Sequence, residues 1–133
     1  MSFGQGARDP VRIVIADEDR LFAEVVRMQL SSREEVEVVG IAATGEEAVE
    51  LAEELEPDLV LMDVSMPVLD GVEAARAITA GSDPPAIVLV TGEDNELDAR
   101  AYEAGAAAYV RKSSGLVAVM DVIVAMSLPA PVC

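Results

Sequence analysis

The stretch Asp58-Leu-Val-Leu-Met62, followed by Asp63-Val-Ser-Met-Pro67-Val-Leu-Asp70-Gly71, contains one strand-to-helix connection. Residues 58–62 form a short, almost continuous apolar run, which is typical of a parallel β-strand covered on both faces. Asp70-Gly-Val-Glu73 is a capping pattern, and the helix that it predicts ends near Gly81. The connection between the two elements therefore begins with a carboxylate, Asp63, at the end of the strand.

The same alternation of apolar runs and helical patterns continues along the chain in both directions. Short, mostly β-branched runs predict further strands at residues 11–16, 36–39, 86–90 and 107–110. Apolar residues at helical spacing predict further helices at residues 20–30, 45–55, 97–104 and 116–126. Five strand-then-helix units predict an α/β fold with one doubly wound, five-stranded parallel sheet and flanking helices, as in flavodoxin-like (βα)5 domains.

Capping residues support the predicted helix boundaries. Asp19 is the expected N-cap of the first helix, and Thr44 opens a capping box with Glu47. Ser113 or Ser114 is the expected cap of the last helix, which we prefer to a strand because of its length. Gly105 is expected to end the helix before it.

The composition is that of one folded domain. The chain has 133 residues, of which 52% are hydrophobic. We predict a flexible N-terminus at residues 1–10, one domain at residues 11–126, and a C-terminal tail or linker stub at residues 127–133. Cys133 is the only cysteine, so no disulfide forms within the chain.

Charge and the absence of histidine exclude several functions. With 9 Lys and Arg against 25 Asp and Glu, the net charge of −16 opposes direct binding to nucleic acid or to an anionic membrane. Without histidine, this chain has no histidine-based catalysis, no histidine metal ligand and no phosphohistidine. Residues 1–10 contain no signal-peptide pattern, and residues 116–126 are too few to span a bilayer, so a cytoplasmic protein is expected.

Polar and charged residues follow four of the predicted strands at one edge of the sheet. They are Asp17 and Glu18 after the first strand, Asp63 after the third, Thr91 after the fourth and Lys112 after the fifth. Each residue alone has a structural explanation as a helix cap, a turn residue or a solvated strand end. Because ligands of doubly wound sheets bind at the carboxyl ends of the strands, all five together predict one site.

The chemistry of this predicted site is phosphoryl transfer. Three clustered carboxylates repel each other unless a cation or a proton joins them, and Mg²⁺ suits an all-oxygen set of ligands. A carboxylate beside such an ion can attack a phosphoryl group and form an acyl phosphate. The metal, the Lys112 ammonium and the Thr91 hydroxyl would share the phosphate oxygens, which makes Asp63 the candidate acceptor.

Four motifs together resemble the receiver domain of two-component response regulators. They are Ile15-Ala-Asp17-Glu18, the stretch from Asp63 to Gly71, Leu89-Val-Thr91-Gly92 and Tyr109-Val-Arg-Lys112. The resemblance covers residues 11–126, and its most specific part is the stretch from Asp63 to Gly71. The first and last motifs are similar to receivers whose regulators carry a helix-turn-helix output domain.

The resemblance implies a phosphorylation-controlled switch with Asp63 as the phosphoacceptor, and not an enzyme acting on a separate substrate. The further roles that it implies are a Mg²⁺ ion held by Asp17, Glu18, Asp63 and the backbone carbonyl of Ser65, switch positions at Thr91 and Tyr109, a small residue at Gly92, and a phosphate-pairing Lys112. The chain departs from the family in two places. Glu18 stands where Asp is more common, so its metal contact would run through water or pass to Asp19. Ser113 stands where many receivers have proline.

The resemblance also implies partners and an output. The phosphoryl group would come from a histidine kinase, from a phosphotransfer protein or from a small phosphodonor. Phosphorylation would change the surface formed by the predicted helix at 97–104, the strand at 107–110 and the helix at 116–126. Two alternatives remain open. One is a haloacid-dehalogenase-like phosphatase with Asp17 of Asp17-Glu-Asp19 as nucleophile, and the other is a degenerate receiver that acts only as a binding module.

The last predicted helix has more apolar residues than one buried face needs. Leu116, Val119, Met120 and Ile123 form the expected core stripe. Val117 and Val124 lie seven residues apart on a neighbouring face. Either other parts of the chain cover them, or they form part of an interface for a homodimer or a partner.

Overall fold

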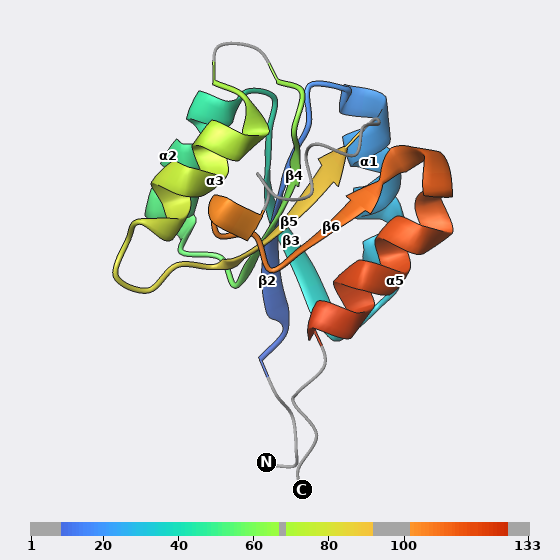
Figure 1. Cartoon of the computed structure of the whole chain (residues 1–133). Coiled ribbons are helices and arrows are strands. Elements are labelled where there is room, and N and C mark those ends of the chain that lie inside the picture. The colour runs from blue at the N-terminus through green and yellow to red at the C-terminus, as the bar shows by residue number, and fades with distance from the viewer. Residues whose placement is uncertain (1–8, 67–68, 92–101, 128–133) are drawn as a thin grey trace, which may run out of the picture.

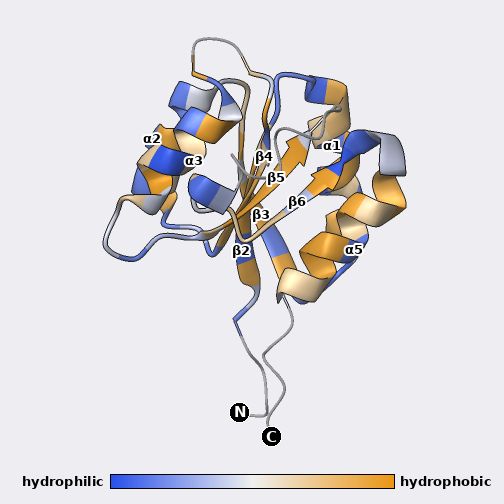
Figure 2. Ribbon diagram, in the orientation of Figure 1, coloured by the Kyte–Doolittle hydropathy of each residue, from blue (hydrophilic) through white to orange (hydrophobic). Residues whose placement is uncertain are grey.

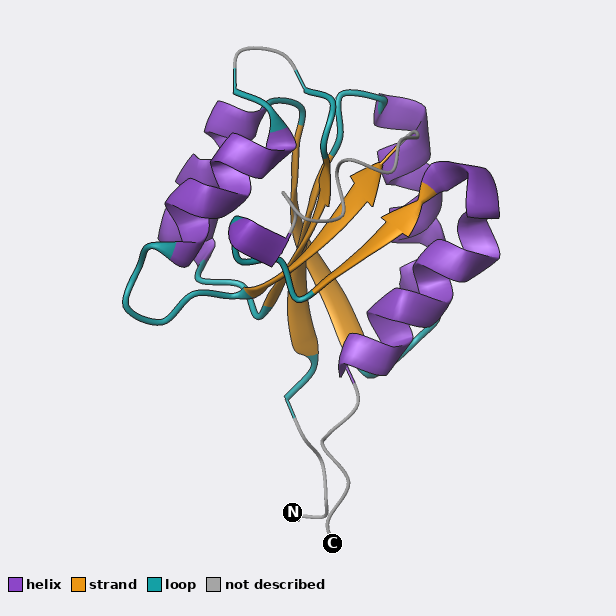
Figure 3. Cartoon of the chain, viewed as in Figure 1, coloured by secondary structure: helices purple, strands orange, loops and turns teal. Residues whose placement is uncertain are grey.

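A computed structural model describes residues 9–66, 69–91 and 102–127 of the chain. Its sheet has five parallel strands: β2 (Val11–Ala16), β3 (Val36–Ala42), β4 (Leu59–Asp63), β5 (Ala86–Thr91) and β6 (Ala108–Arg111). The strand order is β3-β2-β4-β5-β6. The first strand in sequence therefore lies between the second and the third, and this reversal confirms the predicted doubly wound fold (Figures 1 and 3).

Helices cover both faces of the sheet (Figure 1). Helices α1 (Arg20–Leu30) and α5 (Leu116–Ser127) lie on one face, and α2 (Gly45–Leu55) and α3 (Gly71–Thr79) lie on the other. Successive strand residues face opposite sides, as in any β-strand. Along β2, Val14 packs with α2 and α3, whereas Ile13 and Ile15 pack with α1 and α5. Burial on both faces explains the continuous apolar strands, which Figure 2 shows in orange.

Three of the predicted helix caps are confirmed. The side chains of Asp19 and Asp70 accept hydrogen bonds from the backbone N–H groups of Phe22 and Glu73, at 3.1 and 2.9 Å. Thr44 Oγ1 accepts from the N–H of Glu47 at 3.0 Å. Each of these bonds satisfies an N–H group that has no partner within its helix, so α1, α2 and α3 begin where the sequence predicted.

The cap predicted for the last helix was wrong. Ser113 and Ser114 belong to a short 3₁₀ helix (Lys112–Ser114), and Gly115, with φ of +94°, separates it from α5. The carbonyl of Gly115 accepts the first helical bond, from Val119 N, so Gly115 occupies the cap position. A positive φ favours glycine over serine at this turn.

Strand β3 is longer than the sequence predicted. The predicted end at Val39 reflects the glycine that follows, but the strand continues through Gly40 to Ala42. The pairing register with β2 shifts at this point, so that Ile13 pairs with Val38 and Val14 with Gly40. This irregularity is a β-bulge, which accommodates the extra residue without ending the strand.

Two further predictions concern residues that the structure does not fully describe. Most of the helix predicted at residues 97–104 lies outside the described residues, as do Pro67 and Gly92. Gly105 has a φ of +98°, which agrees with its predicted role at a helix end. Among the described residues, no helix is both long and apolar enough to cross a membrane.

Candidate functional site

Two buried carboxylates meet where the strand order reverses. Asp17 directly follows β2, and Asp63 ends the neighbouring strand β4. Their residues are 2% and 6% exposed, respectively. Because parallel strands β2 and β4 pair directly and end at the same edge, the fold itself brings the two acids together.

A lysine from the far side of the sheet reaches both carboxylates. Lys112 follows β6, which is separated from β2 by two strands. Its Nζ atom lies 2.9 Å from Oδ2 of Asp17 and 3.6 Å from Oδ2 of Asp63. Lys112 is also the only lysine in the chain. The sequence placed these three residues in one site, but it did not predict that Asp17 holds the ammonium.

An aromatic ring completes the surroundings of the ammonium. Lys112 Nζ lies 4.5 Å from the ring centroid of Phe22 in α1, a distance typical of a cation–π contact. In the sequence, Phe22 belongs only to the helical pattern of apolar residues, so this contact was not predicted. Its position five residues after Asp17, on the first turn of the helix, is the signal that was available.

Backbone groups hold the second oxygen of each carboxylate. Oδ1 of Asp17 accepts a hydrogen bond from Asp19 N at 2.8 Å, and Oδ1 of Asp63 accepts one from Ser65 N at 3.2 Å. Both bonds span two residues, as in an Asx turn. They orient the Oδ2 atoms of both acids toward Lys112.

Burial controls the protonation of Asp63. Burial and the neighbouring Asp17 charge raise the pKa of Asp63 from 3.8 to about 6, although Lys112 and the Ser65 N–H act in the opposite direction. For Lys112, burial lowers the pKa, but the hydrogen bond to Asp17 and the nearby acidic charges outweigh burial and raise it above 10.5. At neutral pH the site therefore holds an ionised Asp63 beside a charged lysine.

The predicted cluster of three carboxylates does not form. Glu18 is exposed, and within the described ranges no three Asp, Glu or Cys side chains come close enough to hold a metal ion. The reason is local, because neighbouring residues after a strand tend to point to opposite sides and Asp17 takes the buried one. The side chains that the structure brings together here are two acids and one lysine, and the metal role of Glu18 stays a prediction.

Thr91 lies on β5 and Tyr109 on β6, the two strands that follow β4, the strand of Asp63, in the order of the sheet. Thr91 ends β5 and is 2% exposed. Tyr109 in β6 is partly buried and packs against the core cluster on the α2 and α3 side. Its ring contacts that of Tyr102 edge to face, with a centroid distance of 5.9 Å. The two predicted switch residues thus stand on the strands next to the acidic site.

Glycines at the starts of α2 and α3 allow close contacts with the backbone of Asp63 and Leu69. A Cβ atom on Gly71 would lie 2.2 Å from the carbonyl oxygen of Asp63, and one on Gly45 would overlap the backbone of Leu69. Only glycine allows such approaches. The N–H of Gly71 also donates to Val64 O at 2.8 Å, which ties the start of α3 to the residue after Asp63.

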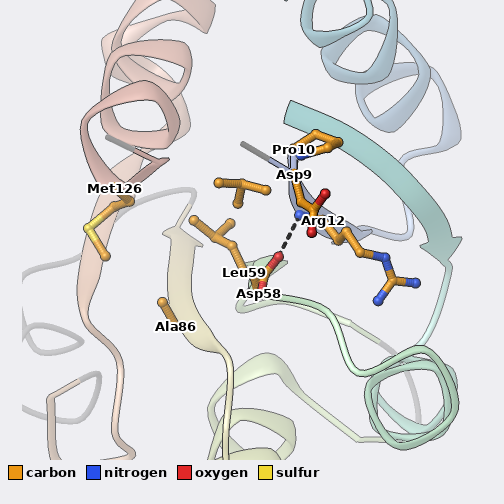
Figure 4. A pocket seen from close by; sticks show the side chains of 8 residues that line it. Asp9, Pro10, Arg12, Asp58, Leu59, Ala86 and Met126 are labelled. Atoms are coloured by element: carbon orange, nitrogen blue, oxygen red, sulfur yellow. Dashed lines mark hydrogen bonds between the residues drawn. The ribbon is translucent and has the colours of Figure 1, made fainter. Parts of the chain in front are cut away.

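A hollow of about 530 Å³ lies at the amino ends of β2, β4 and β5, opposite the carboxyl ends that carry the site (Figure 4). Arg12 and Asp58, two of its charged residues, already have structural partners. Arg12 N donates to Asp58 Oδ2 at 2.9 Å, and Arg12 Nη1 donates to Leu55 O at 2.6 Å, at the end of α2. These contacts connect β2 to the end of α2 and to the residue before β4, so we assign the hollow no chemical role.

Comparison with known proteins identifies the family. Residues 13–124 match the model of the response regulator receiver domain, so the chain belongs to this family of two-component signalling proteins. Its structure is similar to the signal receiver domain of NarL from Mycobacterium tuberculosis, with a TM-score of 0.83 and 31% identity, covering 90% of this chain and 98% of the other. The response regulator domain of Thermotoga maritima CheB gives 0.81 and 28%, covering 92% and 99%.

Curated relatives have different outputs. The chain is 46% identical to the transcriptional regulatory protein PdtaR of Mycobacterium tuberculosis over 106 residues, which are 77% of this chain and 50% of that protein. It is 39% identical to a protein-glutamate methylesterase/protein-glutamine glutaminase of Myxococcus xanthus, over 80% of this chain and 31% of that protein. The chain thus spans half or less of the length of these relatives.

Proposed function

We propose that the chain is a phosphorylation-controlled switch in which Asp63 accepts a phosphoryl group from a histidine kinase or a phosphotransfer protein. The observation that carries the proposal is the buried pair of Asp17 and Asp63 with Lys112, at the edge where the strand order reverses. In the step itself, a carboxylate oxygen of Asp63 attacks phosphorus. The P–N bond to the donor imidazole breaks, and its electron pair stays on the imidazole nitrogen.

Residues of this chain prepare Asp63 for that reaction. Ser65 N holds Oδ1 of Asp63 in place, and the ionised carboxylate is available at neutral pH. The Lys112 ammonium lies close enough to offset charge that builds up on the incoming phosphoryl oxygens. Thr91 ends the next strand, where its hydroxyl would turn toward the acyl phosphate and Tyr109 would follow.

The oxygen donors at this edge fit Mg²⁺. Receiver domains bind this ion for phosphorylation, and Mg²⁺ in proteins is held by one or two carboxylates together with water and phosphate oxygens. Asp17 and Asp63 supply the two buried carboxylates, and the backbone carbonyl of Ser65 is the proposed third protein ligand. Glu18, which is exposed, would act through water. When bound, the ion would supply charge neutralisation for the phosphoryl oxygens.

Several expectations stay predictions. They are the domain limits of 1–10, 11–126 and 127–133, the cytoplasmic location, and the absence of direct nucleic acid binding. We also propose that this chain by itself is not an enzyme for a separate substrate, beyond its own phosphorylation and dephosphorylation. The family match displaces the haloacid-dehalogenase-like alternative, which needed Asp17 as nucleophile.

The test is uptake of phosphate from acetyl phosphate or from a phosphorylated kinase in the presence of Mg²⁺. We expect the intact mass to increase by one phosphate in the wild type and in Asp83→Asn, an exposed control at the other edge of the sheet. Asp63→Asn should take up none. Uptake by Asp63→Asn would place the acceptor elsewhere, and no uptake by the wild type from either donor would support the degenerate-receiver alternative.

A further inference from the structure

The hydroxyl of Thr79 connects the end of α3 to the turn that precedes β6 (Figure 1). Thr79 Oγ1 lies 2.9 Å from the carbonyl oxygen of Ala104, 25 residues further along the chain. Within its own helix, the hydroxyl also lies 2.8 Å from the oxygen of Ala75 and 3.3 Å from that of Arg76. A threonine hydroxyl has one hydrogen to donate, so the three carbonyl groups compete for it.

The carbonyl of Ala104 is the favoured acceptor of that hydrogen. Ala75 O already accepts the helical hydrogen bond from the N–H of Thr79. Ala104 lies in the turn that ends the helical residues 102–103, and residue 108, which would be its donor in a longer helix, begins β6. Because Ala104 is only 2% exposed, water is a poor substitute for a protein donor. We therefore assign the Thr79 hydrogen to Ala104.

The backbone of Gly105 packs against the same side chain. A Cβ atom on Gly105 would lie 2.7 Å from Thr79 Oγ1 and 2.9 Å from Thr79 Cβ and Cγ2. The N–H of Gly105 donates to Tyr102 O at 3.1 Å, so the turn and Tyr102 are tied together. A displacement of the end of α3 would therefore move this turn as well.

The start of the same helix is tied to the backbone around Asp63. The N–H of Gly71 donates to Val64 O at 2.8 Å, and Gly71 lies directly against the carbonyl oxygen of Asp63. The nine residues of α3 between the two contacts form a rigid secondary element, which is the kind of element that transmits a displacement. The helix thus extends from the strand end of Asp63 to the turn before β6.

This turn directly follows one of two contacting tyrosine rings. Tyr102 lies two residues before Ala104, and its ring contacts that of Tyr109 edge to face, with a centroid distance of 5.9 Å. Tyr109 is partly buried against the core cluster on the side of α2 and α3. Contacts of this kind depend on the relative orientation of the two rings. A movement of the turn would therefore change the surroundings of Tyr109.

We propose that Thr79 is a positioning residue for Tyr109. Its hydroxyl holds the turn, and the turn holds the Tyr102 ring against which Tyr109 rests. Through α3, this gives Asp63 a connection to the tyrosine pair that does not pass through Thr91. The connection to Asp63 rests on the proposed function, whereas the positioning of the two rings does not. Loss of one hydrogen bond should shift the equilibrium away from the observed ring arrangement by about fivefold.

Fluorine NMR of the full chain, with fluorinated tyrosine incorporated, tests the positioning. Tyr102 and Tyr109 are the only tyrosines, so the spectrum has two signals, and Tyr102→Phe leaves only the signal of Tyr109. Thr79→Val removes the hydroxyl but keeps the branched shape, so both signals should move. Thr79→Ser keeps the hydroxyl and should give the wild-type positions. The control is Ser127→Ala, which removes a hydroxyl whose bond to Ile123 O stays within α5 and should move neither signal.

These variants distinguish positioning from packing. If Thr79 contributes only to packing, Thr79→Val lowers the free energy of unfolding in urea and moves neither tyrosine signal, and this result overturns the proposal. Signals that move equally in Thr79→Ser and Thr79→Val also overturn it, because the hydroxyl is then not the cause. If the valine variant does not fold, Thr79→Ala gives the same readout, since alanine is the better helix former.

Acetyl phosphate and Mg²⁺ then test the connection to Asp63. In the wild type, the Tyr109 signal should move on phosphorylation. In Thr79→Val the mass should still increase by one phosphate, but the signal should move less, because the equilibrium starts about fivefold closer to its end point. Equal movement in both proteins overturns the connection through α3. Failure of the wild type to take up phosphate would overturn the proposed function alone, because the signals without acetyl phosphate still decide the role of Thr79.

Discussion

The ammonium of Lys112 lies 2.9 Å from the carboxylate of Asp17, although their strands, β6 and β2, are separated by two others in the sheet. The ion pair therefore extends across the carboxyl ends of β4 and β5 and passes Asp63 at 3.6 Å. In the absence of metal, Lys112 is the cation that keeps two buried acids together.

Replacing Lys112 by methionine should separate its two roles. Without Mg²⁺, the repulsion between Asp17 and Asp63 is no longer offset, and we expect the free energy of unfolding at pH 7.5 to fall by about 1–2 kcal/mol. Mg²⁺ should still bind and should stabilise the variant more than the wild type, because the ion no longer competes with the ammonium. Thermal unfolding with and without Mg²⁺ measures both effects. Loss of the Mg²⁺ effect in Lys112→Met would show that the lysine is needed for metal binding.

The fold was largely predictable because its signals are local. Continuous apolar strands such as 58–62 and caps such as Thr44 each determine one element, and five units of the same kind allow few arrangements. Where prediction failed, a distant contact or a special φ decided the outcome. Strand β3 continues past Gly40 because of its pairing with β2, and Gly115 displaces the serine caps.

The sequence predicted which residues form the site but not how their side chains contact one another. The rule that ligands bind at the carboxyl ends of strands placed Asp17, Asp63 and Lys112 together. It could not determine which of two successive acids is buried, and the structure buries Asp17 and leaves Glu18 exposed. The contact of Phe22 with Lys112 depends on how α1 packs on the sheet next to α5, and that packing is not a property of either sequence segment.

Phe22 should act as a positioning residue for Lys112. Because Lys112 is the only lysine, a protein with ¹³C at the lysine Cε gives one side-chain signal from the site. Phe22→Leu removes the ring, so this signal should move, and phosphorylation by acetyl phosphate should slow by several-fold, on the order of 1 kcal/mol. Phe22→Tyr keeps the ring and should restore both. An unchanged lysine signal in Phe22→Leu would contradict the contact. Equal phosphorylation rates in Phe22→Leu and Phe22→Tyr would show that Phe22 contributes only to packing.

Gly71 should be far less tolerant of substitution than Gly81. A Cβ on Gly71 would lie 2.2 Å from a backbone oxygen, whereas one on Gly81 would meet only Ile78 O at 3.5 Å. We expect Gly71→Ala to lower the free energy of unfolding by about 2–4 kcal/mol and Gly81→Ala to change it by less than about 1 kcal/mol. Urea denaturation measures both. Similar stabilities of the two variants would mean that α3 moves freely relative to β4, and slower phosphorylation of Gly71→Ala would show that Asp63 moves with it.

Asp63 should make the metal-free protein less stable as the pH rises. Burial and Asp17 raise the pKa of Asp63 from 3.8 to about 6, so between these values the folded state binds more protons than the unfolded state. Stability from this residue is therefore present below about pH 4 and is lost as the pH rises through about 6. The cost above pH 7 is roughly 1–3 kcal/mol. Asp63→Asn cannot ionise, so it should be more stable than the wild type at pH 7.5 by about that amount and nearly equal to it at pH 4. Chemical denaturation without Mg²⁺ at both values measures the difference, with Asp83→Asn as the exposed control. An Asp63→Asn variant that is equally stabilised at both pH values would mean that relief of charge is not the cause.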